Sequence, residues 1–139
     1  MRPAWAFLVI WMALPALAQE EASVKQLMLD LIHPASNDIL LFVNRGAPMT
    51  EAEWSVVRRS AITLEEAGGL LMTRGRPRDQ GDWAQDAKAL SDVGALAYKA
   101  ARGKDLNALA ALTESLDASC TGCHKQYRPN VFPREGGSK

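Results

Sequence analysis

The strongest constraint on the fold is a helical spacing of apolar residues, which begins near residue 20 and recurs along most of the chain. In the first segment these residues stand three or four positions apart, and this spacing places them on one face of an α-helix. They are Val24, Leu27, Met28, Leu31, Ile32, Ile39, Phe42 and Val43. Pro34 interrupts the segment, and because a proline inside a helix removes a backbone hydrogen bond, it predicts a kink or a short break there.

Turn and capping residues divide the next part of the chain into helices. The sequence NRGAP at 44–48 ends the first helix, because it supplies a glycine and a proline where a helix stops. Thr50 and Glu53 form a capping box, which predicts the start of a second helix. This helix ends in the glycine- and proline-rich segment 74–82, and we expect Asp82 to cap a third helix.

A fourth helix follows the turn RGKD at 102–105, with Asp105 as its predicted cap. It ends near Arg128, because the following Pro129 disfavours helical geometry at that arginine. No run of alternating residues flanked by hairpin turns indicates a strand. We therefore predict an all-α fold, an antiparallel up-down-up-down bundle of four helices joined by short loops.

Three glycines lie inside the predicted helices, namely Gly68, Gly69 and Gly94. Each costs up to about 1 kcal/mol relative to alanine in a helix interior. Close approach of a neighbouring helix or of a bound cofactor would explain all three. A local break in the helix would explain the Gly68-Gly69 pair equally well.

The two ends of the chain differ from the middle. Residues 1–18 have one early positive charge, an apolar run and the small-residue pattern Ala-Leu-Ala, which together indicate a secretory signal peptide cleaved after Ala18. The alternative, a single membrane anchor, is less favoured because the apolar run is short for a bilayer. We expect a periplasmic protein with one helical domain over 19–130 and a flexible tail over 131–139.

Both cysteines and one of the two histidines stand together in the sequence Cys120-Thr121-Gly122-Cys123-His124. This CxxCH pattern is typical of covalent haem attachment, in which both thiols form thioethers and the histidine binds the iron. A zinc site is less favoured because it needs four ligands, and only the distant His33 could join these three. A redox dithiol normally lies in a βαβ unit, and a disulfide at this spacing would be strained.

The motif CTGCHKQYR at 120–128 resembles that of the cytochrome c′ family, the class II c-type cytochromes, and the resemblance extends over the whole mature chain. Members of that family are exported four-helix bundles with one covalent haem on the last helix. An aromatic residue and an arginine follow the CxxCH motif at the positions that Tyr127 and Arg128 occupy here. The resemblance implies that Arg128 lies near the haem propionates; the alternative is a solvated charge at a helix end.

The sixth ligand of the iron decides the function, since His124 supplies only one axial ligand. Met28 resembles the methionine ligand of six-coordinate family members, and the alternative is that it fills the core. Ile32 is expected to pack on the haem in either case. His33 is a poor candidate because, five residues after Met28, it stands about 140° away around a regular helix.

We therefore predict a c-type cytochrome that transfers one electron at a time with His124 and Met28 as axial ligands. It is expected to be a redox carrier and not an enzyme, with an unidentified partner protein and, as in its family, a possible homodimer through the first two helices. A formal net charge of zero argues against nucleic acid as a partner. The alternatives are a five-coordinate haem that binds NO or CO, and a haem-free metal-binding or structural bundle.

Overall fold

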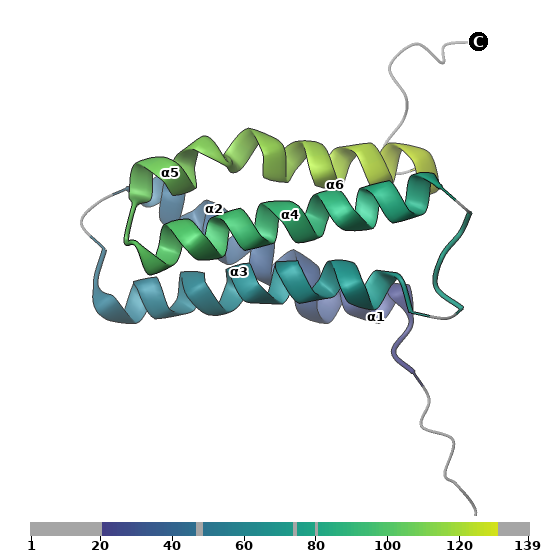
Figure 1. Cartoon of the computed structure of the whole chain (residues 1–139), viewed down its shortest axis with the longest axis horizontal. Helices are drawn as coiled ribbons and strands as arrows, with labels where there is room; N and C mark the ends of the chain where they lie inside the picture. The colour runs from purple at the N-terminus through teal and green to yellow at the C-terminus, as the bar shows by residue number, and fades with distance from the viewer. Residues whose placement is uncertain (1–20, 47–48, 74, 80, 131–139) are drawn as a thin grey trace, which may run out of the picture.

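A computed structural model describes residues 21–46, 49–73, 75–79 and 81–130 of the chain, and these ranges are helical without any strand (Figure 1). The prediction of an all-α fold is therefore confirmed. The elements are α1 (Val24–Leu27), the π-helical turn η1 (Met28–Ile32), α2 (His33–Arg45), α3 (Glu51–Leu71), α4 (Asp82–Arg102), α5 (Leu106–Ala111) and α6 (Thr113–Tyr127). The predicted signal peptide and C-terminal tail lie outside the described residues.

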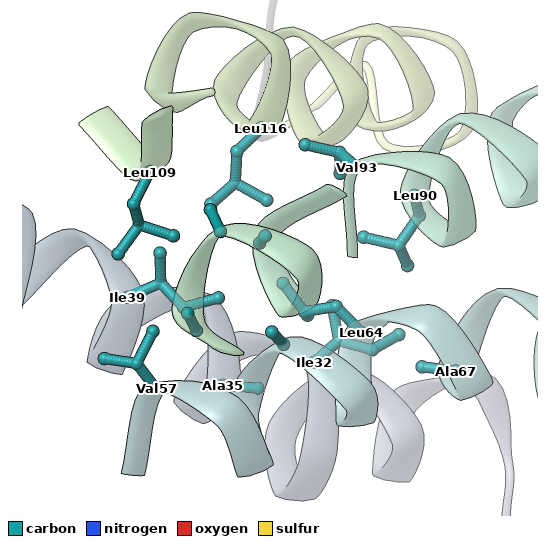
Figure 2. Packing of buried hydrophobic residues seen from close by; sticks show 14 of the residues in the cluster. Ile32, Ala35, Ile39, Val57, Leu64, Ala67, Leu90, Val93, Leu109 and Leu116 are labelled. Atoms are coloured by element: carbon teal, nitrogen blue, oxygen red, sulfur yellow. The ribbon is translucent and has the colours of Figure 1, made fainter. Parts of the chain in front are cut away.

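The long helices run side by side and enclose one apolar core (Figure 1). The contact between α3 and α4 is the most extensive, α2 packs against α3, and α6 packs against α4. Figure 2 shows side chains from every one of these helices pointing into the same interior. Those labelled are Ile32, Ala35, Ile39, Val57, Leu64, Ala67, Leu90, Val93, Leu109 and Leu116. Over the described part of the chain, none of the helices is both long and apolar enough to cross a bilayer.

The first helical segment contains a π-helical turn where the sequence predicted a kink or a break. It begins with a capping box that the sequence analysis missed, in which the Ser23 hydroxyl accepts a hydrogen bond from the backbone N–H of Gln26 at 3.2 Å. The helix then widens over η1, so the N–H of His33 donates to the carbonyl of Met28, five residues earlier. Pro34 explains the widening, because it has no N–H for the usual α-helical bond and its ring crowds the preceding turn.

Two predicted caps are present. The Thr50 hydroxyl accepts from the N–H of Glu53 at 3.3 Å, and the Glu53 carboxylate accepts from the N–H of Thr50 at 2.7 Å. The Asp105 carboxylate accepts from the N–H of Ala108 at 2.9 Å. Helices α3 and α5 therefore begin where the sequence placed them.

The predicted cap of the third helix is wrong. Asp82 is the first residue of α4, and the residue before it, Gly81, has no capping side chain. Asp79 caps α4 instead: its Oδ1 accepts hydrogen bonds from the N–H of Trp83 at 2.9 Å and from the N–H of Gly81 at 3.1 Å. The loop folds back over the helix start, and an aspartate three residues earlier therefore reaches the free amides.

The predicted fourth helix is divided. Leu112 separates α5 from α6, with backbone angles φ −88° and ψ −6°. Its N–H donates to the carbonyl of Leu109 at 3.1 Å, and the hydroxyl of Thr113 donates to that of Ala110 at 2.8 Å. A threonine hydroxyl that binds a nearby carbonyl can compete with the backbone ladder, and Thr113 makes such a bond where the helix is interrupted. The end of α6 at Tyr127, with Arg128 as C-cap, is as predicted.

Close approach of neighbouring helices explains two of the three helical glycines. A Cβ added at Gly68 would lie 2.5 Å from the carbonyl oxygen of Ala87 on α4. Gly94 on α4 meets the backbone of α3 in the same way, whereas Gly69 has nothing within 4 Å of such an atom. Helix α3 runs unbroken through Gly68 and Gly69, so the alternative of a local break is wrong.

Candidate functional site

A mostly apolar pocket lies between the first helical segment, α4 and the second half of α6, with a free volume of about 40 Å³. Five of the residues predicted to bind or contact a haem line it together. Its lining residues are Met28, Ile32, Leu71, Trp83, Asp86, Ala87, Leu90, Ser119, Cys120, Cys123 and His124. Side chains separated by about ninety positions in the sequence therefore meet in one place.

The first segment contributes Met28 and Ile32 from the two ends of η1. Ile32 is buried, with 5% of its surface exposed, and Met28 is half-buried against the core. His33 is exposed and is not among the residues that line the pocket. The thioether of Met28, and not the imidazole of His33, is thus available on this side.

Helix α6 contributes Cys120, Cys123 and His124. Residues three and four positions apart share one face of an α-helix, so the CxxCH spacing directs all three side chains toward the same pocket. The two cysteines are free thiols and are half-buried. The site therefore presents two thiols and an imidazole on one side and a thioether on the other.

Asp86 is an unexpected carboxyl group in this pocket. Its Oδ2 is buried and has no hydrogen-bond partner among the described residues. Burial raises the pKa of this carboxyl group, while a hydrogen bond with Cys123 acts in the opposite direction. An acidic side chain in a mostly apolar lining is costly unless another polar group satisfies it.

Burial also changes the acidity of the groups on α6. It raises the pKa of the Cys123 thiol to about 12, with the negative charge of Asp86 and the hydrogen bond to it as further causes. The pKa of the Cys120 thiol is raised mainly by burial. The pKa of His124 is lowered by burial and by the positive charge of Arg128, which favours the neutral imidazole, the form that binds metals.

Tyr127 and Arg128 do not line the pocket. The Tyr127 ring packs edge-on against Trp83, with ring centroids 5.0 Å apart, and its hydroxyl donates to Asp79. Tyr127 therefore joins the end of α6 to the loop before α4. It contacts Trp83, which lines the pocket, but does not line the pocket itself. Arg128 is exposed just beyond the helix end.

Helix α4 contributes lining residues that were not predicted from the sequence, namely Trp83, Asp86, Ala87 and Leu90. Trp83, Ala87 and Leu90 form the buried apolar face of this helix. Asp86 gives the clearest missed signal, since an acidic residue at this register interrupts the stripe. Within the ranges that the structure describes, no three His, Cys, Asp or Glu side chains are arranged to hold a metal ion by themselves.

Comparison of the chain with family models, with curated proteins and with solved structures gives no match. The resemblance to the cytochrome c′ family therefore depends on the motif at 120–128 and on the helical pattern.

Proposed function

We propose that the protein is an exported, periplasmic c-type cytochrome that transfers single electrons. One haem would be attached through Cys120 and Cys123, with His124 and Met28 as axial ligands, in an antiparallel up-down-up-down bundle. The observation that carries this proposal is that Met28, from the first segment, lines the same pocket as the CxxCH residues of α6.

The chemistry of the lining suits a haem. The lining supplies apolar side chains, the two thiols of Cys120 and Cys123 that would hold a haem, and the imidazole of His124 and thioether of Met28 that would bind its iron. When bound, the haem supplies a one-electron couple at its iron.

The chain's own residues would set the properties of that couple. A thioether ligand stabilises the reduced iron, so Met28 would raise the reduction potential. Ile32 and Leu90, both buried, would exclude water from the haem faces. Arg128, exposed beyond the end of α6, would be free to pair with a propionate, and we keep it as a proposed contact.

An optical spectrum of the haem-loaded protein before and after addition of carbon monoxide tests the proposal. We expect a low-spin spectrum with a weak far-red sulfur-to-iron band, no change with carbon monoxide, and loss of the band in Met28→Ala. Met72→Ala is the matched control, because Met72 is 43% exposed and does not line the pocket. A high-spin spectrum that shifts with carbon monoxide would instead identify a gas-binding haem, and a chain without covalent haem would contradict the proposal altogether.

A further inference from the structure

The π-helical turn η1 contains one more residue than a turn of α-helix, because its hydrogen bond spans five residues and not four. Leu27 and Ile32 are both buried, with 4% and 5% of their surfaces exposed, although they are five residues apart. In an α-helix five residues rotate the chain by about 500°, which leaves two such side chains roughly 140° apart. The wider turn of η1 brings them back to the same face.

Both ends of this segment are held in place. At its start, Arg76 donates from Nε and Nη2 to the carbonyl of Ala22, at 3.0 and 2.8 Å, and only 10% of the Arg76 side chain is exposed. At its end, α2 buries Ala35 and Ile39 in the core. The chain between these anchors therefore has to accommodate the additional residue inside η1.

The register of this turn selects the residue that reaches the pocket. Met28 lines the pocket, whereas its neighbour Leu29 is 59% exposed. If η1 became an α-helix while α2 stayed fixed, every residue before the turn would move by one position around the axis. Leu29 would then occupy the place of Met28, and Met28 that of Leu27.

We propose that Pro34 is a positioning residue that keeps Met28, and not Leu29, facing the pocket. Proline cannot donate to the carbonyl of Asp30, as the residue at this position of an α-helix would, and its ring crowds that carbonyl. The π turn avoids both problems, and it uses the N–H of His33 for the carbonyl of Met28. Provided that the proposed function holds, Pro34 thereby also decides whether the haem iron has a thioether as its sixth ligand.

Nuclear Overhauser contacts from the Met28 methyl group test the register without any haem. In the haem-free full chain we expect a contact between this methyl group and the Trp83 ring, and its loss in Pro34→Ala. The contact should return when Asp30 is also deleted, because Met28 then stands three residues before Ile32, the place that Leu29 takes in the regular α-helix of Pro34→Ala. Pro77→Ala is the matched control and should keep the contact, because Pro77 is exposed and lies outside the first helical segment.

The same variants loaded with haem test the consequence for the iron. Pro34→Ala should lose the far-red sulfur-to-iron band and gain carbon monoxide binding, and deletion of Asp30 should reverse both changes. A Pro34→Ala protein that keeps the Met28–Trp83 contact would overturn the inference, and so would a deletion variant that fails to regain it. If Pro34→Ala does not fold, the Met28–Trp83 contact in the variant that combines Pro34→Ala with deletion of Asp30 decides the inference.

The two proposals fail in different ways. If the wild-type chain binds no haem, or binds it without a sulfur ligand, the proposed function fails. The methyl contacts of the haem-free chain still decide whether Pro34 sets the register of η1.

Discussion

Gly94 on α4 lies directly against the backbone of Glu65 on α3: a Cβ added to this glycine would be 2.4 Å from the Glu65 nitrogen and 2.8 Å from its Cα. One turn earlier, the Ser91 hydroxyl donates to the Glu65 carbonyl at 2.7 Å. The crossing of α3 and α4 therefore consists of backbone against backbone. A side chain at this position would therefore fit only if the backbones of α3 and α4, the two longest helices of the fold, moved apart.

This contact predicts that Gly94→Ala destabilises the protein. The added methyl group meets backbone and not a flexible side chain, so we expect a loss of about 1–3 kcal/mol or more in the free energy of unfolding. Gly69→Ala is the control: nothing lies within 4 Å of the new atom, and the higher helix propensity of alanine should stabilise α3 by up to about 1 kcal/mol. Urea denaturation of the two variants measures both values, and equal midpoints would contradict the close packing.

A second prediction concerns the pH dependence of stability through Asp79. The pKa of this carboxyl group is lowered from 3.8, first by the hydrogen bond from Tyr127 and then by the N–H of Trp83. A lowered pKa in the folded state stabilises the fold at pH values above 3.8, and this contribution is lost as the pH falls through the folded-state value. We therefore expect the difference in urea midpoint between wild type and Asp79→Asn to be largest near neutral pH and to narrow below pH 3.8.

Tyr127→Phe separates the hydroxyl group from the ring. The variant keeps the edge-on contact with Trp83 and removes the largest cause of the low Asp79 pKa. Its Asp79 pKa, followed by a carboxyl-carbon titration in NMR, should rise toward 3.8. An unchanged pKa in this variant would mean that the backbone amides alone stabilise the carboxylate.

The sequence was sufficient to predict the features that depend on local pattern. The spacing of apolar residues predicted the helices, and Thr50 and Asp105 marked the start of two of them. The helix starts could be predicted because each depends on residues a few positions apart. The resemblance, and not local pattern, placed Met28 and Ile32 at one site with the CxxCH residues, and all five line one pocket.

Several of the features that the sequence missed depend on contacts between elements or on the conformation of a loop. Pro34 indicated a disturbance in the first helix, but the neighbouring residues did not predict its form, a π turn that leaves both Leu27 and Ile32 buried. Asp79 caps α4 because the loop folds back over the helix start, and Asp82, one residue too late, cannot do so. The place of Asp86 beside Cys123 required the packing of α4 against α6.

The last prediction concerns the reactivity of Cys123 in the haem-free chain. Burial, with the negative charge of Asp86 and the hydrogen bond to it, raises the pKa of this thiol to about 12. At the same pH, Cys123 should therefore carry much less thiolate than an exposed cysteine, and since the thiolate is the nucleophile, it should be alkylated slowly. Asp86→Asn removes the negative charge next to the thiol, and alkylation at pH 8 should accelerate.

Cys120 provides the internal control for this experiment. Its pKa is raised by burial and by Asp117, and Asp86 is not among the causes. Mass spectrometry of the two cysteines after timed alkylation should thus show a faster reaction at Cys123 alone in Asp86→Asn. Equal acceleration at both positions would mean that the substitution opens the pocket, because greater access to solvent acts on both thiols. An unchanged rate at Cys123 would instead show that burial, and not the charge of Asp86, keeps this thiol protonated.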